Sequence, residues 1–216
     1  RPSGQVKLTR QPLMKPRLLL ALAALTSFIT LHAQEPTQLT PEELTKATAL
    51  LMDANTRLGE LPLKLELAPE QAVGFKAGDA GALLIPDKRL KIEKAAKGDK
   101  AAKKKAKGEA IVVGQLWTKQ LAPQDKDSVL PNGKLRLVKV NTKDKELELA
   151  VFALAIEPAG KREFQLVLYS QGSSPVLRVP LTAEKAKGAA PVVMSARKTG
   201  EETGVLELKL LGRYKA

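Results

Sequence analysis

The spacing of apolar residues changes from a helical period to a strand period at Gly59. Thr40, Pro41 and Glu43 supply a capping residue, a first-turn proline and a T-x-x-E capping box, which together predict the start of a helix. Downstream of this start, apolar residues recur at steps of three and four, as one face of a helix requires: Leu44, Ala47, Leu51, Ala54 and Leu58. The pattern predicts an amphipathic helix that ends at Gly59 and docks on the rest of the fold.

Beyond Gly59 the apolar period is two residues, which is typical of half-buried strands. Leucines alternate with other residues over 61–67, and 72–85 contains two short strand patterns around a Gly-Asp-Ala-Gly turn. The stretch 111–121 is another strand pattern, broken at Gly114. Further strand-like runs follow, separated by stretches rich in turn-forming residues: Lys134–Val140, Glu146–Ile156, Glu163–Ser170, Val176–Leu181, Val192–Arg197 and Val205–Leu211.

Short strands at this spacing, combined with few helices, predict a mainly β fold. We expect a single antiparallel β-sandwich or barrel domain over residues 40–216, with an N-terminal amphipathic helix. Ala150–Ile156 contains no polar residue, so we expect it to be a central strand that is buried on both faces. A lysine-rich loop is inserted into this domain at about 88–109.

Residues 14–33 have the order of a cleavable secretory signal peptide. Met14 is the first methionine, Lys15 and Arg17 supply a basic start, and an apolar run, Leu18–Leu31, follows. This run is shorter than the roughly 20 residues that cross a bilayer. The pattern therefore favours a cleaved leader over a membrane anchor.

Cleavage near Ala33 would divide the chain into parts with different fates. We expect residues 1–13 to be an unstructured upstream extension, because they show no packing pattern, and 34–39 to be a polar linker. The mature chain would be exported, periplasmic or extracellular, without a transmembrane span. Cleavage would also remove His32, the one histidine of a chain that has no cysteine.

A mature chain without histidine and cysteine lacks the residues of several common catalytic systems. Ser-His-Asp and Cys-His nucleophiles are excluded, and so are the usual ligands of zinc and copper. Disulfides are excluded as well. The sequence therefore predicts a protein that is not an enzyme, with no catalytic residues, no metal site and no cofactor.

The positive charge is concentrated in two short segments. The formal net charge is +13, of which residues 1–33 contribute five basic residues and no acidic residue. The window 88–109 contains ten basic and three acidic residues. A nucleic-acid-binding domain usually distributes its cations along an element that faces the groove. The whole-chain charge therefore says little in favour of nucleic acid.

The lysine-rich loop is the candidate binding site for a polyanion, either an anionic polysaccharide or an envelope surface. Seven lysines would make the contact: Lys94, Lys97, Lys100, Lys103, Lys104, Lys105 and Lys107. Residues 94–107 include no aromatic residue that could stack on bases and no arginine that could grip phosphate with two hydrogen bonds. We therefore expect non-specific attraction at most, and no sequence-specific recognition of nucleic acid. A solvated loop without a partner is the competing interpretation.

These features favour an exported, non-catalytic binding or structural module, and two alternatives stay open. A hydrolase would need two facing carboxylates or a serine with a lysine base, and Ser195 and Lys198 have S-x-x-K spacing within a strand-like stretch. A non-specific nucleic-acid binder would use the lysine-rich loop. Trp117 is interpreted as a core residue, with an exposed sugar-binding platform as the alternative.

Overall fold

The computed structural model describes most of the chain downstream of the predicted leader and one short segment upstream of it. The described residues are 6–10, 35–91, 110–125, 128–142, 145–160, 163–184, 190–201 and 203–216. Strands make up 53% of this structure and helices 14%, so the predicted mainly β class is confirmed. The described strands form two open antiparallel sheets. In these ranges no barrel closes, so the barrel alternative does not hold for the described part of the chain.

The larger sheet is built around one long strand, β9 (Glu146–Pro158). One edge of β9 pairs with β5 (Ile111–Lys119), and the other edge is shared by β10 (Phe164–Tyr169) and β8 (Arg136–Asn141). The remaining strands extend the sheet on both sides: β11 (Leu177–Pro180) next to β10, and β4 (Ala80–Pro86), β3 (Val73–Ala77) and β2 (Thr37–Gln38) beyond β5. Ala150–Ile156 is buried along its whole length, which confirms the predicted central strand.

The smaller sheet contains strands from both ends of the sequence. β14 (Thr203–Leu210) pairs with β13 (Val192–Lys198) along one edge. The other strands follow in the order β12, β15, β14, β1, β6 and β7, with these bounds: β12 (Thr182–Ala183), β15 (Tyr214–Lys215), β1 (Val6–Arg10), β6 (Leu121–Asp125) and β7 (Ser128–Val129).

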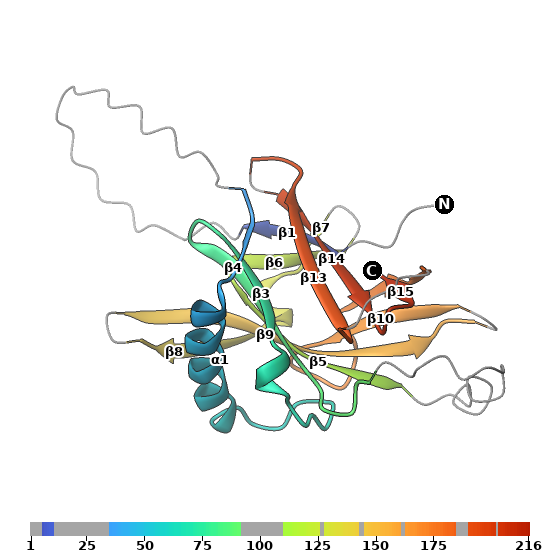
Figure 1. The fold of residues 1–216 in the computed structure, drawn as a ribbon, viewed down its shortest axis with the longest axis horizontal. Coiled ribbons are helices and arrows are strands. Elements are labelled where there is room, and N and C mark those ends of the chain that lie inside the picture. Colours follow the sequence, from blue (N-terminus) through green and yellow to red (C-terminus); the bar gives the residue numbers. More distant parts are fainter. Residues whose placement is uncertain are drawn as a thin grey trace.

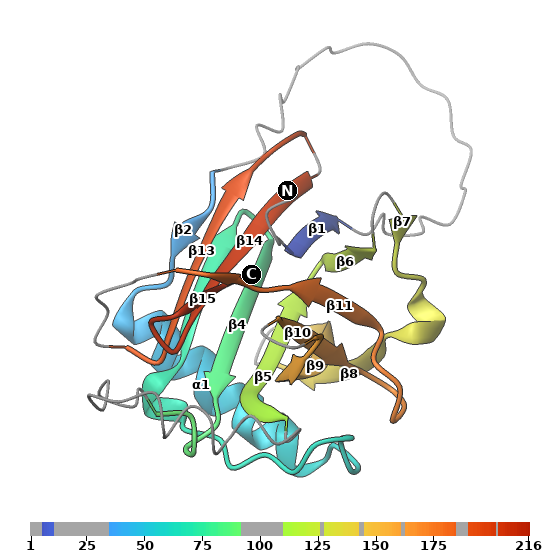
Figure 2. The same cartoon turned by 90° about the vertical axis from the view of Figure 1, so that its right-hand side faces the viewer.

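Strand β1 places residues 6–10, which lie within the 1–13 stretch expected to be unstructured, in the smaller sheet, and the rest of that stretch lies outside the described residues. The strand pairs antiparallel with β14 on one side and with β6 on the other, and Figure 2 shows it between these two strands. Apolar and polar residues alternate over Val6–Thr9, and four alternating residues by themselves are weak evidence for a strand. Its partners lie far away in the sequence, so a local pattern could not reveal them.

The helix follows the sequence prediction closely. α1 (Pro41–Thr56) begins after Thr40, whose hydroxyl oxygen accepts from the backbone nitrogen of Glu43 at 3.3 Å. The Glu43 carboxylate accepts from the backbone nitrogen of Thr40 at 3.0 Å, which completes the capping box. Figure 1 shows α1 against the larger sheet beside β8. Among the described residues, no helix is long and apolar enough to cross a bilayer.

Residues 61–67 do not form the predicted strand. Exposure alternates only over residues 64–67, with Lys64 and Glu66 exposed and Leu65 and Leu67 more buried. The stretch makes one isolated bridge, from Leu67 to Asp87, instead of a ladder. A short 3-10 turn, η1 (Pro69–Gln71), follows it, and a second one, η2 (Asn132–Lys134), precedes β8.

The larger sheet has an apolar core on each face. One core lies between the sheet and α1 and contains Leu51, Trp117 and Val151. The other core combines side chains of the larger sheet, such as Phe152, with Leu206 and other residues of the smaller sheet. The two sheets also meet directly, because the Gln38 side chain of β2 donates to the Met194 carbonyl of β13 at 2.7 Å.

Strand β5 enters the core through a bulge and leaves it through a sharp corner. The bulge is at Gly114, where φ is 150° and an added Cβ would lie 2.3 Å from the Ile85 carbonyl oxygen. Only glycine fits this close approach. The corner is at Gln120, with a φ of 55°. It separates β5 of the larger sheet from β6 of the smaller sheet, so one continuous segment serves both sheets.

Candidate functional site

The seven lysines of the predicted binding loop lie in 92–109, outside the described residues. The structure shows the two places where this segment joins the fold. Lys91 follows the end of β4, and Ala110 precedes β5. β4 and β5 are antiparallel neighbours, with Pro86 opposite Gly114. The lysine-rich segment therefore starts and ends at the same end of the larger sheet.

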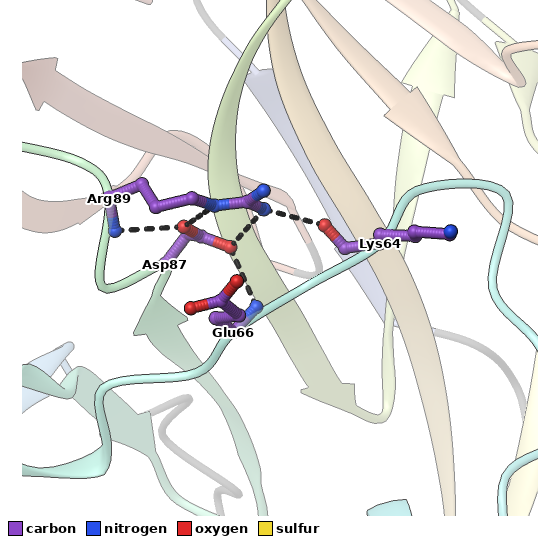
Figure 3. Close-up of polar contacts among 4 residues, drawn as sticks. All are labelled: Lys64, Glu66, Asp87 and Arg89. Atoms are coloured by element: carbon purple, nitrogen blue, oxygen red, sulfur yellow. Dashed lines mark hydrogen bonds and ion pairs between the residues drawn. The ribbon is translucent and has the colours of Figure 1, made fainter.

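Asp87 lies where this segment leaves the fold, and Figure 3 shows its contacts with Arg89 and Glu66. Its side chain is 0% exposed. One carboxylate oxygen accepts from the backbone nitrogen of Arg89 at 2.9 Å and from Arg89 Nε at 2.8 Å. The other accepts from Arg89 Nη2 at 2.9 Å and from the backbone nitrogen of Glu66 at 2.8 Å. Four hydrogen bonds thus satisfy a buried carboxylate, as burial of a charge requires.

These contacts shift the ionisation of both partners. Burial raises the pKa of the Asp87 carboxyl, but the hydrogen bonds from Arg89 and from the Glu66 backbone outweigh it and hold the pKa below its usual value. The hydrogen bonds to Asp87 raise the pKa of the Arg89 guanidinium. Asp87 is therefore a carboxylate at neutral pH with all its hydrogen bonds made, which suits an anchor better than a general acid.

The same cluster ties the 61–67 stretch to the end of β4. Arg89 Nη2 donates to the Lys64 carbonyl at 2.7 Å, and the backbone nitrogen of Lys88 donates to the Glu66 carbonyl at 2.6 Å. The backbone nitrogen of Asp87 reaches across to the Val113 carbonyl of β5 at 2.9 Å. Three segments are therefore fixed to one another where the lysine-rich segment joins the fold.

Exposed cations gather on this anchored base, which we call the basal platform: Lys64, Lys88, Arg89 and Lys91. Two carboxylates accompany them, the buried Asp87 and the exposed Glu66. The sequence predicted the basic window from residue 88 onwards but missed Lys64, which comes from a stretch predicted to be a strand. No local pattern reveals this proximity. The closest signal is the Asp-Lys-Arg run after the buried β4 strand.

Trp117 is a core residue, as predicted. It is 2% exposed, and its Nε1 donates to the side-chain oxygen of Gln115 at 3.0 Å. Gln115 in turn donates to the Asn55 side chain of α1 at 2.8 Å. This relay satisfies the polar atoms of a buried tryptophan and links α1 to β5. Trp117 is therefore not available as a sugar-binding platform.

The serine and lysine of the hydrolase alternative do not face each other. Ser195 is exposed on β13 and stands opposite Glu207 of β14. Lys198 is three residues further along the same strand, so its side chain points to the other face of the sheet. Ser170 is 0% exposed and structural. Its hydroxyl oxygen accepts from the backbone nitrogen of Arg136 at 2.6 Å, where the ends of β8 and β10 meet along β9.

Several carboxylates outside the basal platform take part in ion pairs, and one contacts a tyrosine. Lys139 pairs with Glu146 at 2.8 Å, and Lys215 pairs with Glu207 at 2.6 Å. The Tyr169 hydroxyl donates to the Glu157 carboxylate. Burial is the main cause that raises the pKa of Tyr169 to about 12, and this hydrogen bond is the second. In the described ranges no three His, Cys, Asp or Glu side chains are grouped so that they could hold a metal ion.

Comparison with known proteins adds no further assignment. No protein-family model matches the sequence, and neither the curated proteins nor the solved structures contain a significant match.

Proposed function

We propose that this chain is an exported, non-catalytic module that contacts an anionic polymer or envelope surface through its lysine-rich segment. The observation that carries the proposal is the basal platform. Lys64, Lys88, Arg89 and Lys91 are exposed around the buried Asp87 anchor, and Lys91 precedes in sequence the segment that contains the seven lysines at 94–107. The platform adds Lys64, which lies outside the basic window 88–109 in the sequence, to the cations of that window.

The type of cation indicates how a partner would be bound. Lysine ammonium groups are strongly hydrated point charges on long side chains, so they attract anions without fixing their geometry. Arg89 is the exception on the platform, but its guanidinium is already hydrogen-bonded to Asp87 and to the Lys64 carbonyl. The surface therefore suits a repetitive polymer of carboxylates, sulfates or phosphates, bound by charge and weakened by salt.

The fold supplies a scaffold for such a contact. We describe it as a β-sandwich flanked by one helix, since residues of both sheets share one apolar core. Phe164 of β10 and Tyr214 of β15 also bring the sheets together, with ring centroids 5.3 Å apart. A module of this kind would display the lysine-rich segment from the end of a rigid sheet.

Export forms part of the proposal and has its own test. The support is the order of a basic start, an apolar run and a small residue over 14–33. N-terminal sequencing of the protein from its native compartment should find a start at about residue 34. A mature protein that begins upstream of Met14 would contradict cleavage and export by this route.

The binding proposal is tested with one variant and one matched control. The test variant replaces the seven segment lysines with glutamine, and the control replaces seven lysines of other surfaces: Lys46, Lys76, Lys134, Lys139, Lys145, Lys209 and Lys215. Both variants have the same net charge. Retention on a polygalacturonate column and on duplex DNA is measured over a salt series.

The segment variant should elute from polygalacturonate at lower salt than both the full chain and the control. Equal elution of the two variants would show that net charge alone binds the polymer and would contradict the proposal. On duplex DNA, each lost phosphate contact lowers the salt slope by about 0.9. DNA binding that is tighter than polygalacturonate binding and steeply dependent on salt would favour the nucleic-acid alternative.

A further inference from the structure

The position of β1 in the smaller sheet is the starting point. β1 pairs with β14 from Val6 opposite Leu206 to Thr9 opposite Thr203, and with β6 from Leu8 opposite Pro123 to Arg10 opposite Leu121. It is antiparallel to both neighbours, so β14 and β6 run parallel to each other. β1 belongs to the part of the chain that the proposed cleavage near Ala33 would remove.

Removal of β1 would leave a slot one strand wide. Neighbouring strands lie about 4.8 Å apart, so β14 and β6 would be separated by about 10 Å, too far for direct pairing. Most residues of the two walls are apolar, and Val205, Leu206 and Ala122 are buried in the complete sheet. Two facing rows of unpaired backbone groups beside apolar side chains would invite another strand.

The two walls cannot simply close. β14 is held from behind by β13 over seven residue pairs, and its distal part is covered by β15 and by Ala216, which exchanges backbone hydrogen bonds with Leu208 at 2.9 and 3.1 Å. β6 follows the corner at Gln120 directly after β5, which is paired on both edges. Closure would break one of these ladders.

Pro123 in the β6 wall does not interfere with an incoming strand. Its carbonyl accepts from the Leu130 nitrogen at 3.0 Å, and Leu130 follows β7. The amide and carbonyl of one strand residue point to the same side, so this proline removes no donor from the edge that faces the slot. The slot therefore offers main-chain partners on both walls.

We propose that this slot is a strand-acceptor site: in the cleaved chain it binds an extended segment of another polypeptide, antiparallel to β14 and β6. The proposal rests on the proposed export, which empties the slot. The occupant needs two open edges. A strand that already belongs to a sheet has at most one open edge, so a second folded copy of this sheet cannot fill the slot. A partner segment that lies outside any sheet can fill it.

The pairing also defines the chemistry of the partner segment. Most of the binding comes from main-chain hydrogen bonds, with side chains selected at alternate positions. The residue opposite Leu206 stands beside a buried core position, and the residue opposite Gly204 faces a position without a side chain. An apolar residue fits both positions, as in the Val-x-Leu pattern of β1.

The test uses the full chain with a site-specific protease sequence inserted between residues 24 and 25. The folded protein is cleaved at this sequence, and a wash in mild denaturant then removes the fragment that contains β1. The probe is a fluorescent peptide of residues 4–12. It should bind the cut chain. Its affinity for the uncut chain should be at least about tenfold lower, because the tethered β1 competes at high effective concentration. Hydrogen exchange at Gly204 and Leu206, whose amides face the slot, should speed up after the wash and slow down when the peptide is added.

Two altered peptides test the role of the main chain. A peptide with Lys7→Pro and Leu8→Pro lacks two consecutive N–H groups, which point to opposite walls. Its affinity should therefore be at least about tenfold lower than that of the original peptide. A peptide with Lys7→Ala should stay within about threefold of the original, because its main chain is unchanged.

Three results would overturn the proposal. The washed, cut chain could bind no peptide while the amides of Gly204 and Leu206 stay protected, which would show that the slot closes. The proline peptide could bind as well as the original, which would show that the contact is not a strand pairing. The cut chain could form a dimer in which the amides of Gly204 and Leu206 are protected, which would make a second copy the occupant. If the native protein retains residues 6–10, the proposed cleavage is wrong. The peptide measurements on the cut chain still test the strand-acceptor site, so the two failures can be told apart.

Discussion

The basal platform and the β14–β6 slot are both places where a segment joins the body of the fold, and they hold that segment by different means. At the platform, one buried side chain, Asp87, makes four hydrogen bonds. At the slot, β1 is held by strand pairing on two edges. The first depends on the identity of single residues, whereas the second depends mainly on the course of the backbone. Mutations should therefore affect the two places in different ways.

The largest effect should come from Asp87→Ala. The substitution leaves the Glu66 amide and part of the Arg89 guanidinium without their acceptor, in a place where Asp87 was fully buried. We expect the free energy of unfolding to fall by about 2–3 kcal/mol, measured by chemical denaturation. Asp53→Ala is the matched control, because Asp53 pairs with Arg57 on the exposed face of α1. The control should lose at most about 0.5 kcal/mol. Equal losses would contradict the role of Asp87 as an anchor.

The pH dependence of the same anchor should be the next largest effect. Because folding lowers the pKa of Asp87, its stabilising contribution is complete above the unfolded pKa of about 3.9 and is lost as the pH falls through the folded value. The difference in unfolding free energy between the wild-type chain and Asp87→Asn should be constant from neutral pH to about pH 5 and shrink below about pH 4. A difference that grows on acidification would contradict the assignment.

Strand β1 should respond to the backbone and not to the side chain. In the full chain, Leu8→Pro removes one ladder donor and should lower the unfolding free energy by about 1 kcal/mol. Hydrogen exchange should become faster at Gly204 and Leu206, whose amides face β1. Lys7→Ala should change stability by less than about 0.5 kcal/mol and leave this exchange unchanged. A larger loss for Lys7→Ala than for Leu8→Pro would remove the contrast with the platform.

The smallest effect on stability should come from the lysine-rich segment itself. Replacement of its seven lysines with glutamine should change the unfolding free energy by less than about 0.5 kcal/mol while it lowers retention on polygalacturonate. Denaturation of this variant next to Asp87→Ala would separate the function of the segment from the stability of its base. A loss as large as that of Asp87→Ala would mean that the lysines belong to the folded body.

Local sequence patterns predicted those elements whose stabilising contacts are also local. The capping box of Thr40 and Glu43 placed the start of α1 correctly, and the unbroken apolar run 150–156 identified the buried centre of β9. Both signals lie within a few residues of the structure that they specify. The same holds for Trp117, whose first hydrogen-bond partner is Gln115 on the same strand.

The features that the sequence did not reveal depend on distant partners. The 61–67 stretch has the period of a strand, but the Glu66 amide bonds to the Asp87 side chain instead of a neighbouring strand. Ser170 is buried because of contacts at the junction of β8 and β10, which no local pattern indicates. The pairing of β1 joins residues at opposite ends of the sequence. Export, the leader and the lysine-rich segment remain predictions.

The arrangement around β9 also has a kinetic consequence. This strand receives β5 from earlier in the chain on one edge, and β8 and β10, its immediate sequence neighbours, on the other. The hairpins with β8 and β10 close short loops, so they can form early at little entropic cost. β5 joins later, and the pairing of β1 with β14, which closes the longest loop, comes last. Folding should therefore start at β9, and the order in which strands assemble should differ from the order in which they are synthesised.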